Sequence, residues 1–214
     1  MHIPEHFRLR HDSDAIAFMR ANPFAILVTS RGEGPFATHL PLFLREEEGR
    51  VLLRGHVAKA NPHWRYLEEE TRCLVIFHGP HSYISPANYT ARESVPTWNY
   101  VAVHVYGNAR IFSSADEVLS MLNELIETFE PAYRSQWEDL NQSFRENMLR
   151  QIVGFEITAT KVEGKFKLSQ NRTREDQANV MASLEKSPDT AVSGVAEMMK
   201  EQRLGKVAEQ RKGE

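Results

Sequence analysis

The sequence predicts an α+β protein, mainly antiparallel β, with peripheral helices and a helical C-terminal extension. Short apolar segments rich in β-branched and aromatic residues recur between residues 24 and 162, and most are joined by tight turns with few intervening helices. Such strands form an antiparallel barrel, because parallel strands need long helical crossovers. From Thr173 onward, helical spacing replaces the strand pattern. We therefore expect a barrel domain over residues 1–172 and a helical extension over residues 173–214.

The N-terminal part of the barrel begins with a short helix. Its N-cap candidates lie at residues 11–14, and it ends at Asn22-Pro23 because the residue before a proline is pushed out of helical geometry. Asparagine followed by proline at Asn61-Pro62 favours a second helix that begins at Pro62. Strands are expected over residues 24–29, 36–44 and 50–54.

The second part of the barrel contains the helix with the clearest signals. Ser114 and Glu117 have capping-box spacing, and apolar residues then recur at helical intervals until Pro131. A further helix is expected over residues 141–151. Strands are expected over residues 72–78, 81–85, 97–112 and 153–162, with a loop at 86–95.

In the C-terminal extension, Ser187-Pro188 ends one helix and starts another. The last helix has only a thin apolar stripe, formed by Val192, Val195, Met199 and Leu204. We expect this helix to lie outside the barrel and its stripe to rest on a dimer partner, another protein or nucleic acid.

The composition excludes several classes of protein. Of 214 residues, 41% are hydrophobic and 26% are charged, and the net charge is -3. No apolar run is long enough to span a bilayer and the N-terminus has no signal-peptide pattern, so we expect a cytoplasmic protein without membrane contact. The small negative charge argues against a broad phosphate-binding surface. Cys73 is the single cysteine and lies in an apolar strand segment, where core packing is expected.

The segment from Arg54 to Pro62 is a candidate anion site. A strand there delivers Arg54, His56 and Lys59 to the start of a helix. Unpaired N–H groups and partial positive charge at a helix N-terminus, together with a lysine, favour a phosphate group. The alternative is that these are solvated turn residues and that Lys59 points to water.

Two later segments are candidates for ligand contacts. Trp98 and Asn99 lie in one strand-like segment and would offer a flat ring a stacking face and an amide for its edge. The alternative is a tryptophan packed under a loop. The segment from Gly164 to Arg172 is polar and basic, and its pattern alone indicates a loop.

The common metal and nucleotide motifs are not found. The chain has nine histidines, but no HExxH pattern and no cluster of histidine, cysteine and carboxylate residues, so we predict no metal site. There is also no P-loop, no GxGxxG and no GxSxG motif. No residue is identifiable as a general acid or base.

Four segments resemble one known family. Residues 56–64, residues 83–86, residues 95–100 with His104, and residues 165–172 are similar, in the same order, to the PaiB-type FMN-binding negative transcriptional regulators. The similarity extends from about residue 1 to residue 203. It implies an FMN-binding split β-barrel that carries two flavin sites at the interface of a homodimer.

The resemblance also implies a set of flavin contacts. The flavin phosphate would be held by Arg54, His56, Lys59 and Asn61. The strand beside the isoalloxazine ring would be formed by Thr38, His39, Leu40 and Pro41. The ring or its sugar-like chain would be lined by Trp98 and Asn99. The segment with Lys167, Ser169 and Gln170 would reach across from the other subunit.

The resemblance leaves the activity open. A regulator would bind DNA or another partner, yet the sequence shows no helix-turn-helix, and residues 197–212 mix charges as a solvated helix does. A flavin-dependent oxidoreductase is the main alternative, with His39 and His104 as proton donors if they face the ring. A haem-handling protein is a third interpretation.

Overall fold

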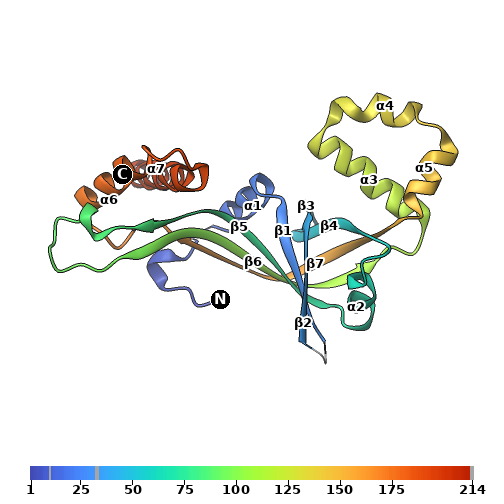
Figure 1. The fold of residues 1–214 in the computed structure, drawn as a ribbon, viewed down its shortest axis with the longest axis horizontal. Coiled ribbons are helices and arrows are strands. Elements are labelled where there is room, and N and C mark those ends of the chain that lie inside the picture. Colours follow the sequence, from blue (N-terminus) through green and yellow to red (C-terminus); the bar gives the residue numbers. More distant parts are fainter. Residues whose placement is uncertain (10, 32–33, 213–214) are drawn as a thin grey trace. The chain divides into compact units, whose positions relative to one another are not determined.

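The structure is a computed structural model that describes residues 1–9, 11–31 and 34–212 (Figure 1). Its strands form one antiparallel sheet in the order β2-β1-β5-β6-β7-β4-β3. The predicted α+β, mainly antiparallel fold class is confirmed. The strands are β1 (Phe24–Arg31), β2 (Gly34–Pro41), β3 (Phe43–Glu47), β4 (Arg50–Ala58), β5 (Arg72–Ile84), β6 (Thr97–Ile111) and β7 (Ile152–Lys167).

Except for α4, which the sequence analysis does not predict, the helices lie close to their predicted positions. They are α1 (Asp12–Ala21), α2 (His63–Glu69), α3 (Ala115–Phe129), α4 (Arg134–Asp139), α5 (Gln142–Leu149), α6 (Arg174–Leu184) and α7 (Thr190–Lys212). Short 3-10 turns occur at Glu5–Phe7, Pro86–Asn88 and Pro131–Tyr133. Among the described residues, no helix is both long and apolar enough to cross a membrane.

Helix α3 is capped as the sequence predicts. The Ser114 Oγ accepts a hydrogen bond from the Glu117 N–H at 3.2 Å. The Glu117 carboxylate accepts from the Ser113 N–H at 2.9 Å, one residue before the donor that a capping box uses. Both bonds satisfy backbone donors at the helix start, and the helix ends before Pro131 as expected.

The strand expected over residues 36–44 is divided in two, so that prediction is wrong. Strand β2 ends at Pro41 and β3 begins at Phe43, with only Leu42 between them. The Leu42 N–H donates to the Pro23 carbonyl at 2.9 Å and the Leu42 side chain is buried, so the chain turns inward at this residue.

This division makes the sheet curve into an incomplete barrel. Strand β2 pairs with β1 at one end of the strand order, and β3 pairs with β4 at the other end. Since a single residue joins these two edge strands, the sheet has to curve until its edges approach each other, and β2 also contacts β4. The result is a barrel that stays open between β2 and β3.

The strands expected at 72–78 and 81–85 are one strand, β5, and this prediction also has to be corrected. Gly79 and Pro80 do not end the strand, but the buried face changes there. Cys73 and Phe77 are buried before this point, and Ser82 and Ile84 after it. Since side chains alternate along a strand, odd and even positions have exchanged faces.

Strand β7 shows the same change of face. Phe155 and Ile157 are buried in its first part, and Gly164 and Phe166 in its last part. The residues from Gly164 to Lys167 therefore belong to a strand, and the prediction of a loop is wrong for them.

The changes of face coincide with a division of the chain into two compact units. Unit 1 consists of Met1–His11, His78–Val103 and Gly164–Glu214, and unit 2 of Asp12–Phe77 and His104–Glu163. Strands β5, β6 and β7 contribute residues to both units. The domain boundary expected at residue 172 falls inside unit 1.

Each unit has its own core. In unit 2, Leu27, Phe77 and Phe155 are fully buried within the sheet, and a second cluster under α3 contains Phe43, Phe112, Val118 and Met121. In unit 1, α6 and α7 pack together. Val195 and Met199 of α7 are buried in this unit, so the expectation that the α7 stripe rests on another molecule is wrong for these two residues. Leu204 lies outside the residues whose side chains are described.

Candidate functional site

A buried polar chain connects the β1–β2 hairpin to the start of α2. The Asn61 amide donates to the Thr38 hydroxyl at 3.2 Å, and the His63 Nδ1 lies 2.7 Å from the same hydroxyl. The His63 Nε2 lies 3.2 Å from the Thr29 hydroxyl. Burial lowers the pKa of His63 to about 4, so its imidazole is neutral at pH 7. The positions of Thr38 and Asn61 are therefore fixed by the fold.

His63 was not among the residues predicted for the candidate site. It follows the Asn61-Pro62 helix start, and its N–H donates to the Asn61 Oδ1 at 3.0 Å. The signal that could have identified His63 is a polar residue at the first turn of a helix beside a β-hairpin. The helix itself begins at His63, one residue later than predicted.

Lys59 and His56 are at the end of β4 and have unused hydrogen-bonding capacity. The Lys59 side chain is exposed, and its ammonium has no hydrogen-bond or ion-pair partner within the part of the chain that the structure describes. The His56 Nδ1 is buried without a partner there. Burial lowers the pKa of His56, so this ring is also neutral at pH 7. The Lys59 N–H donates to the Gln151 carbonyl at 2.7 Å, which holds the backbone in place.

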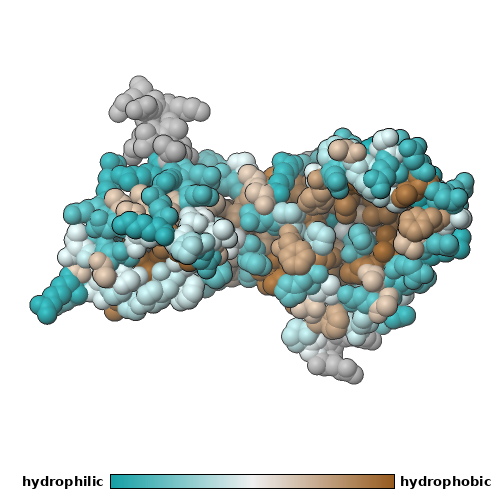
Figure 2. Space-filling view, turned by 45° about the horizontal axis from the view of Figure 1, so that its top comes forward, coloured by the Kyte–Doolittle hydropathy of each residue, from teal (hydrophilic) through white to brown (hydrophobic). Residues whose placement is uncertain are grey.

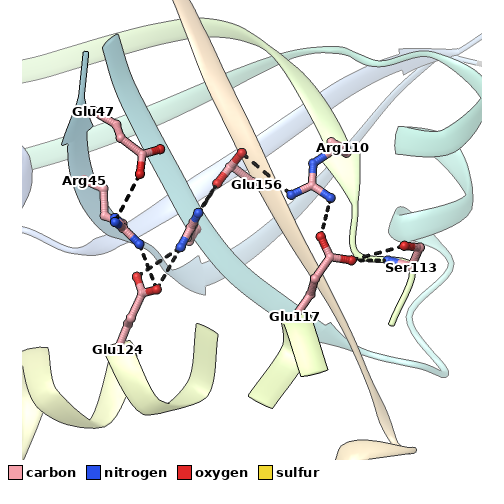
Figure 3. Close-up of polar contacts among 8 residues, drawn as sticks. Arg45, Glu47, Arg110, Ser113, Glu117, Glu124 and Glu156 are labelled. Carbon is pink, nitrogen blue, oxygen red and sulfur yellow. Dashed lines mark hydrogen bonds and ion pairs between the residues drawn. The ribbon is translucent and has the colours of Figure 1, made fainter. Parts of the chain in front are cut away.

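Arg54 has a different environment from Lys59. Its Nε lies 2.6 Å from the Glu156 carboxylate, its Nη2 lies 2.6 Å from the same oxygen, and its Nη1 lies 2.8 Å from Glu124. The surrounding network of Arg45, Glu47, Arg110, Ser113 and Glu117 is drawn in Figure 3. All three guanidinium nitrogens face carboxylates, so Arg54 connects β4, β7 and α3 and has no nitrogen left for a phosphate.

The expected contacts on β2 divide between the two sides of the strand. Leu40 is buried, whereas His39 and Pro41 are exposed. Thr38 lies on the side of Leu40, since side chains alternate along a strand. The ring of His39 is 6.3 Å from that of Phe24, which is itself exposed. A ligand beside this edge strand would therefore meet either the pair His39 and Pro41 or the pair Thr38 and Leu40.

In unit 1, Trp98 and Asn99 are on opposite faces of β6. The Trp98 side chain is 52% exposed and the Asn99 side chain is 0% exposed. The ring of Trp98 lies 5.6 Å from that of His81 and 6.4 Å from that of Tyr83. Of the two residues expected to line the ring or its sugar-like chain, only Trp98 presents an open surface.

Asn99 instead holds the turn that follows β7. Its amide donates to the Ser169 hydroxyl at 2.9 Å and lies 3.9 Å from the Met199 sulfur, while its Oδ1 is buried without a partner among the described residues. Gln170 accepts from the Leu168 N–H at 2.7 Å and donates to the Phe166 carbonyl. Lys167 donates to the Thr97 hydroxyl. Ser169 and Gln170 are thus internal to a tight turn.

Cys73 is a packed thiol and not a nucleophile, as the sequence predicts. Burial raises its pKa to about 12, and its Sγ donates to the Gly107 carbonyl at 3.6 Å. Among the side chains that the structure describes, no three His, Cys, Asp or Glu residues are placed to hold a metal ion.

A comparison with protein families decides the relationship. The family described as “Putative FMN-binding domain” matches residues 1–161. The chain belongs to this family. It is also 37% identical over 203 residues to “Protease synthase and sporulation protein PAI 2” of Bacillus subtilis, which covers 94% of this chain and 97% of that protein. The predicted relationship to the PaiB family is therefore confirmed.

Solved structures share the fold. The FAD and haem binding protein of Mycobacterium smegmatis matches with a TM-score of 0.61 at 14% identity, over 80% of this chain and 78% of that one. The flavocytochrome Anf3 of Azotobacter vinelandii matches with a TM-score of 0.57 at 19% identity, over 83% and 78% of the two chains. This agreement confirms the split-barrel class of the fold.

Proposed function

We propose that this chain binds FMN as a homodimer and that the FMN-loaded protein is a negative regulator of transcription of the PaiB type. The observation that carries the FMN proposal is the donor set at the end of β4. Lys59 offers a free ammonium and His56 a buried, unpaired ring nitrogen, close in sequence to the fixed Asn61. All three residues lie inside the segment that matches the family. A ligand that carries a phosphate would satisfy these groups.

Each group would make a different contribution to FMN binding. Lys59 holds the phosphate by a charge-assisted hydrogen bond, and Asn61 and Thr38 contribute neutral polar atoms whose positions His63 fixes. His39 and Pro41, on the exposed side of β2, border the flat ring. Bound FMN would supply reversible one- or two-electron transfer. Arg54 is left out of the phosphate site because its charge is already neutralised.

In unit 1, some of the expected site residues would contact the flavin, and others would support the turn that holds the contact residues. Trp98 provides an aromatic face for stacking, and Lys167 provides a cation for the flavin of the partner subunit. Asn99, Ser169 and Gln170 support the turn that follows Lys167. The exposed Trp98 and Tyr83, both 52% exposed, favour a homodimer because large apolar side chains are seldom left in water without a partner.

The test is a comparison of FMN with riboflavin, which lacks the phosphate. We expect FMN to bind more tightly, and Lys59→Ala to weaken FMN by roughly ten- to a hundredfold, since one charge-assisted contact contributes ~1.5–3 kcal/mol. Riboflavin affinity should change little. Lys186→Ala removes another exposed lysine and is the matched control. Equal affinities of the wild type for the two flavins would contradict the phosphate site, and a monomer by light scattering that holds FMN would contradict the dimer.

A flavin-dependent oxidoreductase is the second candidate. His104 favours it, because its Nδ1 is buried without a partner among the described residues and burial lowers its pKa. A neutral imidazole of this kind can accept a proton at pH 7. Sustained oxidation of NADH or NADPH by the FMN-loaded protein would support this candidate. FMN-dependent repression in a reporter strain without such turnover would support the regulator.

A further inference from the structure

The connection between β6 and β7 is longer than the sheet requires. These strands are neighbours in the sheet, and antiparallel neighbours can be joined by a turn of two to five residues. Here residues 112–151 lie between them and contain α3, α4 and α5. We call residues 112–151 the helical insert. Its length points to a role other than strand connection.

The helical insert is only partly buried. Helix α5 has no buried residue, and Trp137 is the one buried residue of α4. Phe144 and Met148 are 49% and 46% exposed and lie one helical turn apart on α5. Figure 2 shows hydrophobic residues gathered in the region of α3–α5 with hydrophilic residues around them. The exposed large apolar residues of the helical insert are Phe129, Phe144 and Met148, whereas Leu122, Leu125 and Leu149 are partly buried against the cluster under α3.

The helical insert is also strongly acidic. Its basic residues are Arg134, Arg145 and Arg150, against the acidic residues Asp116, Glu117, Glu124, Glu127, Glu130, Glu138, Asp139 and Glu146. One face of α3 lines an open groove of about 460 Å³ together with Arg134. Three carboxylates, those of Asp116, Glu124 and Glu127, line this groove.

We propose that the helical insert is a docking surface for a basic amphipathic helix of a partner protein. Exposed phenylalanine and methionine side chains can accept the apolar face of such a helix, and methionine adapts to different shapes. The carboxylates of Asp116 and Glu127, which line the groove on α3, complement its lysine and arginine residues.

The same charges disfavour other occupants. Nucleic acids and anionic membranes carry negative charge and would be repelled by the acidic surface. A second copy that docked insert against insert would place two acidic surfaces together, which is costly. The proposal goes beyond the proposed function and does not depend on FMN.

The experiment measures binding of a fluorescein-labelled synthetic helix to the full chain by anisotropy. The probe is a peptide of leucine and lysine, with leucine at helical spacing on one face. We expect saturable binding that weakens as the salt concentration rises. A peptide of the same composition in scrambled order is the control, because it keeps the charge and loses the apolar face.

Two variants separate the apolar from the acidic contribution. Phe144→Ser combined with Met148→Ser should weaken binding by about tenfold at every salt concentration. Asp116→Asn combined with Glu127→Gln should weaken binding at low salt and have little effect at high salt. Val95→Ser combined with Glu93→Gln changes exposed residues of unit 1 and should leave binding unchanged.

Three results would overturn the proposal. They are equal binding of the scrambled peptide, unchanged binding by both variants, and self-association of the free chain that the peptide reverses, which would assign the surface to a second copy. Circular dichroism and thermal melts check folding. If the serine variant does not fold, the paired charge variant decides the question.

Discussion

Arg54 and Glu156 lie directly opposite each other in the β4–β7 ladder, and two guanidinium nitrogens of Arg54 are each 2.6 Å from one Glu156 oxygen. Glu124 of α3 binds the third nitrogen. We predict that Arg54→Met lowers the free energy of unfolding by about 2–3 kcal/mol, because, among the described residues, the partly buried Glu156 keeps only Arg110 at 3.9 Å and Glu124 keeps only Arg45. FMN affinity should change by less than about threefold, which corresponds to less than ~1 kcal/mol of binding free energy. Urea unfolding and flavin titration measure the two effects.

The matched control for Arg54 is Arg45→Met. Arg45 binds the same Glu124 but is more exposed, with a side-chain exposure of 38% against 15%. Its replacement should cost less than ~1 kcal/mol, as is usual for surface ion pairs. If Arg54→Met instead abolished FMN binding while unfolding stayed unchanged, Arg54 would be a phosphate ligand as the sequence resemblance implies.

Ser169 carries a second prediction, because its φ of 63° lies in the left-handed region. Ser169→Val should destabilise the protein by about 2–3 kcal/mol, since a β-branched residue is strained there and the buried Asn99 amide loses its acceptor. Ser169→Gly loses the same acceptor but relieves the strain, so its cost should stay near ~1 kcal/mol. If urea unfolding showed the same loss of unfolding free energy for both variants, the left-handed backbone at residue 169 would not be the cause of the destabilisation by valine.

The pH dependence of stability should reveal His63. Its pKa falls from 6.5 to about 4 on folding, so below pH 6.5 the unfolded chain binds a proton that the folded chain does not. The contribution of neutral, buried His63 to the free energy of unfolding is therefore complete above pH 6.5 and is lost as the pH falls towards 4. Between pH 7 and pH 5 this loss is about 2 kcal/mol for His63. His56 and His104, whose pKa values are also lowered, act in the same direction.

The variant that isolates His63 is His63→Gln, which cannot take up the proton. Urea unfolding at pH 7 and at pH 5 should show a smaller difference for this variant than for the wild type. His78→Gln replaces an exposed histidine and should keep the wild-type difference. Identical pH dependence in all three proteins would mean that His63 is not buried in solution.

Gly194 tests the packing of α7. A Cβ at this position would lie 2.9 Å from the Pro80 Cγ, and a proline ring cannot move aside. Gly194→Val should therefore destabilise the protein by about 1–3 kcal/mol, although valine has the higher helix propensity. Trypsin should cleave faster after Lys186. Glu197→Val introduces the same side chain at an exposed position of α7 and should not increase cleavage.

The sequence predicted most elements, because their signals are local. The capping residues of α3, the Asn61-Pro62 start of α2 and the alternating apolar pattern of β6 all act within a few residues. The division at Leu42 was missed because it depends on closure of the sheet, which brings together strands from its opposite edges. The continuation of β5 through Gly79-Pro80 was also missed, because the change of the buried face at these residues depends on packing in two units.

The candidate site was predictable only in part. The opposite orientation of Trp98 and Asn99 follows from strand alternation alone and could have been recognised. The pairing of Arg54 could not, since its partners Glu124 and Glu156 are 70 and 102 residues away in the sequence. The role of Asn99 as a support for Ser169 likewise depends on a contact over 70 residues.

Strands β5, β6 and β7 each contribute to both units, and this has a consequence for how such a chain can arise. Unit 1 is assembled from three separate stretches, and the two stretches of unit 2 lie between them. No single cut in the gene separates the two, and joining two genes end to end could not produce this order.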